Sequence, residues 1–230
     1  MAIVLKLIAF TPNAANVVAA SAKLCYSPSG AADILEGLDS KKIESFLKML
    51  NETGHMSPFE HVSYTFAIEG ISRVATHQLV RHRLASYSQQ SQRYVEMNVP
   101  SCIVPPSILE NEYALEIFQK QVDFTWECYK KLVLLGIAKE DARFILPHGA
   151  ESRIVVTMNA RELHLFFSLR LCKRAQWEIR EVARQMFMLV RKASPELFVT
   201  GGPSCIVNGT CEEAHPCGDP YSSLENMLSK

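Results

Sequence analysis

The chain has 230 residues, of which 48% are hydrophobic and 21% are charged. This composition is typical of a folded globular protein that buries a substantial core. Because 24 basic residues balance 24 acidic ones, the zero net charge argues against broad electrostatic capture of nucleic acid or of an anionic membrane. Any anion site must therefore be a local concentration of arginine.

Several other classes of protein are disfavoured. No stretch approaches about 18 uninterrupted apolar residues, which a membrane-spanning helix needs, and residues 1–10 are too short and too poorly flanked for a signal peptide. The seven cysteines show no disulfide-like framework, so we expect a reducing cytoplasm. Without repeats or linkers, we predict one domain over residues 1–230, whose tail from about 200 to 230 can be irregular.

The first third of the chain alternates between strand and helix patterns. Apolar residues recur at the helical spacing i, i+3, i+4, i+7 after Asp39, and they alternate with period two around Tyr64. These patterns predict a strand over 3–10, a helix over 13–26, a helix from Asp39 onward and a strand over 62–68. A further helix is expected after Gly70, with an apolar stripe of Ile71, Val74, Ala75 and Leu79.

The rest of the chain predicts mostly helices. Ser107-x-x-Glu110 has the form of a capping box for a long helix that Gly136 stops. Asn159-x-x-Glu162 can cap another helix in the same way. Between and after them we predict a short helix from Lys139, a strand over 154–158 and a last long helix over about 175–192.

The stretch from Arg81 to Tyr94 is the strongest chemical signal. Its fourteen positions hold three arginines, a histidine, three serines and three glutamines, and no acidic residue. Arginine binds phosphate through two parallel hydrogen bonds, and serine and glutamine add neutral ones. The run therefore suits an anionic ligand such as a nucleotide, although a solvated polar loop has a similar composition.

Two polar residues fall in register with apolar stripes. Gln78 lies between Ala75 and Leu79, and Arg170 follows Phe166 and Phe167 at helical spacing. A buried polar side chain needs a partner, and a buried charge needs one more strongly. For Gln78 the alternatives are a local hydrogen bond and a ligand contact, and for Arg170 they are a buried ion pair and a functional role.

The arginine-rich run resembles the signature of flavin-dependent thymidylate synthases through Arg81-His82-Arg83, Ser86, Ser91, Arg93 and Tyr94. Ser88-Gln89 stands where that family usually has Asn-Glu. The resemblance continues in separate blocks between about 55 and 180, namely 55–61, 141–147, 159–161, 169–170 and 175–179. Leu165 departs from it, because an Asn or His near the flavin is expected there.

The resemblance implies methylation of deoxyuridine monophosphate (dUMP) at C5. Methylenetetrahydrofolate would donate the carbon, reduced FAD the hydride, and NADPH would regenerate the flavin. It also implies an α+β fold, a single domain with a mostly antiparallel sheet packed against long helices. The family assembles as a homotetramer with sites shared between subunits, and neither nucleic acid nor membrane is expected as a partner.

The family's site residues carry over onto matching positions of this sequence. Arg170 is the expected catalytic residue and would provide electrophilic activation of the uracil. Ser91 is expected to bind substrate, because no neighbouring base would activate it as a nucleophile. The expected dUMP contacts are Gln78, Arg81, Gln89, Gln90, Ser91, Gln92, Arg93, Arg143 and Arg170. The expected FAD contacts are Ser57, Arg81, His82, Arg83, Gln89, Asn159 and Arg161, without a glycine-rich dinucleotide fingerprint.

The cysteines of the tail do not have the spacing of metal ligands. Cys205, Cys211 and Cys217 recur at gaps of five residues, unlike those of zinc ligands. No metal site is therefore expected, and the thiols are expected to be reduced.

Two other functions would use side chains of the arginine-rich run. A non-catalytic pyrimidine nucleotide-binding protein would use the same arginines. A single-stranded RNA-binding module would use Arg and Tyr and bind with a steep salt dependence.

Overall fold

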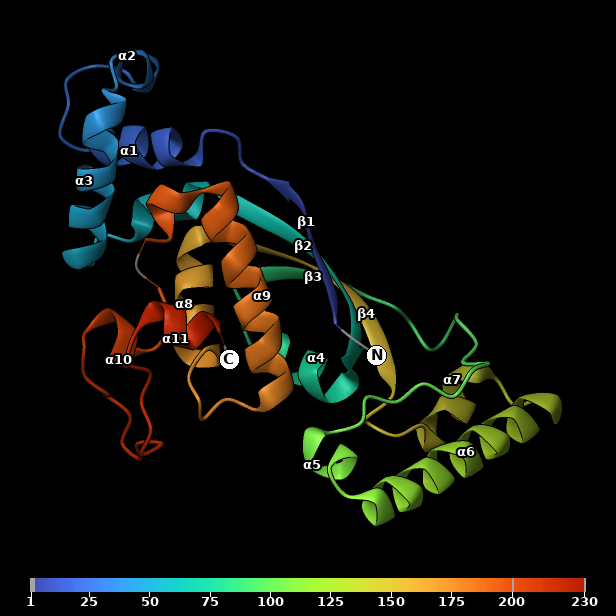
Figure 1. Cartoon of the computed structure of the whole chain (residues 1–230). Helices are drawn as coiled ribbons and strands as arrows, with labels where there is room; N and C mark the ends of the chain where they lie inside the picture. Colours follow the sequence, from blue (N-terminus) through green and yellow to red (C-terminus); the bar gives the residue numbers. More distant parts are fainter. Residues whose placement is uncertain (1–2, 200, 230) are drawn as a thin grey trace. The chain divides into compact units, whose positions relative to one another are not determined.

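A four-stranded sheet runs through the computed structural model, which describes residues 3–199 and 201–229 (Figure 1). Its strand order is β1 (Val4–Phe10), β2 (Ser63–Ser72), β4 (Glu151–Asn159) and β3 (Ala85–Gln89). β2 and β4 run antiparallel, since the amide of Ala160 donates to Val62 and the amide of Arg73 donates to Ala150. The predicted α+β class with an antiparallel sheet is confirmed.

The chain divides into two compact units. The first unit comprises Ile68–Arg81 and Tyr87–Val155 together with the start of the chain, and the second comprises Leu5–Ala67, His82–Ser86 and Val156–Lys230. Of the described helices, none is long and apolar enough to cross a membrane.

The second unit is built on two helices that pack side by side, α8 (Ala160–Arg170) and α9 (Trp177–Ala193) (Figure 1). Their buried aromatic rings meet edge to face, with 5.0 Å between the ring centroids of Phe167 and Phe187. The unit also holds α1 (Ala14–Leu24), α2 (Ala31–Glu36), α3 (Ser40–Glu52), η1 (Ser57–His61), η3 (Pro195–Leu197), α10 (Ser204–Val207) and α11 (Leu224–Leu228).

The first unit is built on the long helix α6 (Glu112–Leu134), and Gly136, two residues beyond its end, has a positive φ of 84°. Val122, Trp126 and Ala150 form a buried cluster there. The unit also holds α4 (Arg73–Leu79), α5 (Pro106–Leu109), α7 (Lys139–Ala142) and η2 (Arg143–Ile145). The short helix predicted from Lys139 is confirmed, and the strand predicted over 154–158 is found as the longer β4.

Two local predictions are wrong. The stripe expected after Gly70 fails because Ile71 still belongs to β2 and Val74 is 38% exposed. There the amides of Arg73 and Val74 donate to carbonyls of the segment before β4, which prolongs the pairing and delays the helix. The capping box at Ser107 fails because Ser107 lies inside α5, and the side chain of Asn111 caps α6 by accepting from the amide of Ala114 at 3.0 Å.

Candidate functional site

Arg170 is held in the second unit by a chain of two hydrogen bonds. Its Nε lies 3.1 Å from Nε2 of His82, and Nδ1 of His82 lies 3.2 Å from Oε1 of Glu162. A guanidinium only donates, so Nε2 of His82 must accept, and its proton must sit on Nδ1 and be donated to Glu162. We call Arg170, His82 and Glu162 the Arg170 relay.

The surroundings of the relay keep His82 neutral. Its imidazole is buried against the ring of Phe166, at 4.8 Å between centroids. Burial, and then the positive charge of Arg170, lower the pKa of His82 to about 4. Burial also raises the pKa of Glu162 and lowers that of Arg170. The result is a fixed cation whose guanidinium edge is oriented by an uncharged partner.

The relay follows from the helical repeat of α8. Glu162, Phe166 and Arg170 are spaced four residues apart, which places them on one face of the helix. Asn159 begins the helix, as predicted, because its side chain accepts from the amide of Glu162 at 2.8 Å. Sequence reasoning used Glu162 only as a capping residue, although two steps of the same spacing place it on the same helix face as Arg170.

The expected flavin contacts of the second unit lie mostly near the start of α8. Ser57 opens η1, which packs against α8, and Asn159 and Arg161 stand at the first turn of that helix. Arg161 is half-exposed and pairs with Glu60 at 2.5 Å. A helix N-terminus beside an accessible guanidinium suits a pyrophosphate. Arg83 is also exposed, whereas both ring nitrogens of His82 are engaged in the relay.

In the first unit, Glu140 contacts two of the predicted arginines, Arg93 and Arg143. Its carboxylate binds Arg93 at 2.7 Å, and its backbone carbonyl accepts from Nε of Arg143 at 3.1 Å. A third arginine, Arg73, which sequence reasoning missed, is affected by the charge of Arg143. Burial, and then the positive charge of Arg143, lower the pKa of Arg73. This cluster of Arg73, Arg93 and Arg143 suits a phosphate, which would relieve the repulsion between like charges.

The glutamines of the arginine-rich run differ from one another. The amide Nε2 of Gln89 donates to Oγ1 of Thr76 at 3.0 Å and to Oγ of Ser152 at 2.8 Å. Gln92 is 7% exposed, and its Nε2 has no hydrogen-bond partner in the described part of the chain. A buried donor without an acceptor costs roughly 1–3 kcal/mol, so Gln92 is the residue of this run that most needs a ligand acceptor.

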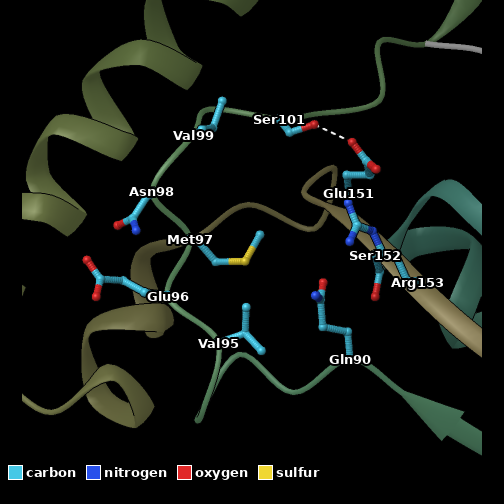
Figure 2. Close-up of a pocket in the computed structure, with 10 residues that line it drawn as sticks. All are labelled: Gln90, Val95, Glu96, Met97, Asn98, Val99, Ser101, Glu151, Ser152 and Arg153. Carbon is cyan, nitrogen blue, oxygen red and sulfur yellow. Dashed lines mark hydrogen bonds between the residues drawn. The ribbon is translucent and has the colours of Figure 1, made fainter.

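Gln90 lies on the wall of a cavity of about 270 Å³ (Figure 2). Its side chain faces the cavity, opposite the 95–99 segment, and Ser101 donates to Glu151 across one end. The lining residues are Gln90, Val95, Glu96, Met97, Asn98, Val99, Ser101, Glu151, Ser152 and Arg153. Of the predicted site residues, Gln90 is the one that this cavity includes.

The remaining predicted residues have less specific surroundings. Gln78 is half-buried on α4 and Arg81 is exposed just after it. Oγ of Ser91 accepts from the amide of Arg93 at 3.2 Å, a local hydrogen bond within the run. Leu165 is 50% exposed on α8, so the position where the family resemblance expects Asn or His presents an apolar side chain.

Comparison with known proteins gives one consistent family. Residues 6–196 match the family described as "Thymidylate synthase complementing protein". The chain is 46% identical to the flavin-dependent thymidylate synthase of Clostridium tetani, over 95% of this chain and 94% of that protein. It is also 46% identical to the enzyme of the same name from Geobacter sulfurreducens, over 92% of each.

A solved structure supports the fold. It is a UMP/dUMP methylase, PolB from Streptomyces cacaoi, bound with 5-Br dUMP. The two chains are 26% identical and align with a TM-score of 0.76, covering 85% of this chain and 93% of the other.

Proposed function

Because the chain belongs to the thymidylate synthase complementing protein family, we propose that it is a flavin-dependent thymidylate synthase that methylates dUMP at C5. Methylenetetrahydrofolate is the carbon donor. Within the structure, the Arg170 relay carries the proposal, because it provides a cation on α8 whose orientation is fixed by His82 and Glu162. Such a group stabilises negative charge that develops on a substrate ring.

The residues at the start of α8 fit a flavin dinucleotide. Arg161 and the α8 N-terminus can hold its pyrophosphate, and Ser57 and Asn159 can add neutral hydrogen bonds. Arg81, His82, Arg83 and Gln89 complete the proposed FAD contacts. When bound, FAD supplies the hydride that converts the transferred carbon to a methyl group.

The arginine cluster and the glutamines fit a pyrimidine nucleotide. Arg93 and Arg143 can bind the phosphate, and Nε2 of Gln92 can donate to a carbonyl oxygen of uracil. We propose Gln78, Arg81, Gln89, Gln90, Ser91 and the residues just named as the nucleotide contacts. Arg73 adds charge near Arg143.

Arg170 acts on the pyrimidine in this proposal. Its guanidinium stabilises negative charge on the ring as C5 becomes nucleophilic, and His82 and Glu162 keep one guanidinium edge in place. Neither His82 nor Glu162 needs to touch substrate for this, so both are positioning residues.

Finer features of the proposal rest on the family alone. They are a single domain over residues 1–230, a homotetramer with sites shared between subunits, NADPH as the reductant of the flavin, and action in the cytoplasm. Sedimentation of the purified chain and a comparison of NADPH with NADH as reductants would test the assembly and the reductant.

The decisive experiment is reconstitution with FAD. The fluorescence of FAD should be quenched when the protein is added, and Arg161→Ala should weaken the quenching. Arg174→Ala is the matched control, because Arg174 is also a half-exposed arginine near a glutamate, Glu213, at 3.9 Å. Unchanged flavin fluorescence at excess protein, together with dUMP binding, would instead favour the non-catalytic nucleotide-binding protein.

A further inference from the structure

Four cysteines of the second unit line one small pocket. Cys172 comes from the turn between α8 and α9, and Cys205, Cys211 and Cys217 come from the tail. The gaps between the three tail cysteines did not predict a metal site. Cys172 is distant from them in sequence, and folding adds it as a fourth thiol, which is the number a closed metal site requires.

The tail around these cysteines has no core of its own. Every residue from 207 to 220 is exposed, and α10 beside it has four residues. The contacts that hold it include an ion pair of Lys173 with Asp219 at 2.5 Å and one of Arg174 with Glu213 at 3.9 Å. Surface ion pairs contribute little to stability. Small segments without a core are usually fastened by a metal or a disulfide.

We infer that Cys172, Cys205, Cys211 and Cys217 form a structural Zn²⁺ site that fastens the tail to the turn between α8 and α9. Four thiolates in a tetrahedron are a common ligand set for structural zinc. The pocket holds about 20 Å³, which suits one small occupant and is too small for a cluster of several iron and sulfur atoms.

The thiols must converge to bind the ion. As the side chains stand, no group of three or more His, Cys, Asp or Glu in residues 3–199 and 201–229 is arranged to hold a metal. Each cysteine has a single side-chain torsion with staggered alternatives, which re-aims its sulfur without moving the backbone. Three of the four thiols also lie on the tail, whose described residues, 201–229, form two helices of four and five residues and no strand, so the tail can adjust.

The charges around the pocket suit the proposed complex. Four thiols release four protons to solvent and bind one Zn²⁺, which leaves a complex with a net charge of two minus. Lys173 and Glu213 line the same pocket, and Arg174 follows Lys173 in the chain. The two cations pair with the exposed carboxylates of Asp219 and Glu213, and such weak surface pairs can be exchanged for a thiolate complex, whose charge the cations would offset.

Metal analysis of the full chain tests this inference. Protein purified with Zn²⁺ and dialysed should retain about one Zn²⁺ per chain. Cys172→Ser and Cys217→Ser should lose it, while Cys25→Ser and Cys128→Ser should keep it. Cys217 is exposed, so its replacement leaves packing intact if Cys172→Ser fails to fold. Zn²⁺ removal should also increase proteolysis within 207–220.

The reduced apoprotein gives a second readout. Addition of Co²⁺ alone should produce thiolate-to-cobalt charge-transfer absorption, and Zn²⁺ should displace it. The inference is overturned if folded, reduced protein binds neither metal, if Cys217→Ser retains full Zn²⁺, or if disulfides join these cysteines in the purified protein. Iron with inorganic sulfide would equally overturn it. Flavin binding is not a readout, so failure here leaves the proposed enzyme function untouched.

Discussion

Arg170 in the second unit and Arg93 in the first unit are held in opposite ways. In the second unit, the partners of Arg170 in the relay are buried, with 5% of His82 and 3% of Glu162 exposed. In the first unit, the Arg93 and Glu140 side chains are 51% and 47% exposed. Exposed pairs contribute little and exchange partners readily, whereas a buried hydrogen-bonded chain fixes both the position and the protonation of its members.

The difference fits two chemical tasks. An arginine that binds phosphate must first release its carboxylate partner, so the weak surface pair of Arg93 with Glu140 is suitable. A catalytic cation must be in place before the substrate charge develops, because preorganised charge is what lowers the barrier. We therefore expect substitutions in the relay to act on turnover and substitutions in the arginine cluster to act on affinity.

Arg170→Ala should have the largest effect. A charge-assisted hydrogen bond contributes roughly 1.5–3 kcal/mol, so turnover should fall by tens- to hundreds-fold or more. Glu162 retains its bond to His82 in this variant, so within the relay only Nε2 of His82 loses a hydrogen-bond partner, at a cost of about 1 kcal/mol. The melting temperature and FAD binding should therefore change little, as thermal unfolding and flavin fluorescence would measure.

Arg170→Lys is the matched control for charge. It keeps the cation but loses the planar fork, so turnover should recover only in part. A large fall in melting temperature of Arg170→Ala, with turnover preserved in the folded fraction, would show that Arg170 is structural.

His82→Gln should come next, with about a tenfold loss of kcat and little change in KM, because a misaligned guanidinium weakens transition-state binding first. A glutamine can accept from Arg170 and donate to Glu162, but it does not titrate. The split between kcat and KM tests the positioning role, and the effect on the pH dependence of stability tests whether the folded histidine is buried and neutral.

The sign of that pH dependence follows from the lowered pKa of His82. The unfolded histidine takes up its proton near pH 6.5 and the folded one only near pH 4. The unfolded state therefore binds more protons in this window, and the free energy of unfolding falls as the pH drops from about 6.5 to about 4. His164, whose pKa burial also lowers to about 4, contributes to the same slope. His82→Gln should flatten the slope in part, and an unchanged slope would contradict the assignment.

Sequence reasoning succeeded where periodicity decides the structure. The alternation around Tyr64 predicted β2, and the Asn159 cap predicted the start of α8. It failed at Ile71 because pairing with the segment before β4 overrides the helical pattern. Sequence reasoning could not predict that Glu140 pairs with Arg93, that His82 binds Arg170, or that Cys172 lies beside the tail cysteines. Each of these contacts joins residues that are far apart in the sequence.

Glu140→Gln should have a smaller effect on the first unit. It removes the negative charge from Arg93 while its backbone carbonyl still accepts from Arg143. Arg93 then binds phosphate without giving up an ion pair, so the Kd for dUMP should tighten by up to about fivefold, the equivalent of roughly 1 kcal/mol. Titration calorimetry would measure it, with Arg93→Ala as the variant that must weaken binding. Weaker binding by Glu140→Gln would show that Glu140 positions Arg93.

Gln89→Glu should have the smallest effect, although it restores the family's usual carboxylate. The Gln89 amide donates to Thr76 and Ser152, and the hydroxyl of Thr76 already donates to the carbonyl of Arg73 at 3.0 Å. A carboxylate can accept from Ser152 after its hydroxyl rotates, but it gains no proton from Thr76. One lost hydrogen bond costs about 1 kcal/mol, which lowers the melting temperature of a chain this size by roughly 2–4 °C.

The Kd of Gln89→Glu for dUMP should stay within about threefold of the original value, since the other donors and the cations nearby are unchanged. Gln121→Glu is the matched control outside the proposed site, because the amide of Gln121 also donates to a threonine hydroxyl, that of Thr125, at 3.2 Å. If folded Gln89→Glu no longer binds dUMP while Gln121→Glu does, the amide and the carboxylate are not equivalent at position 89.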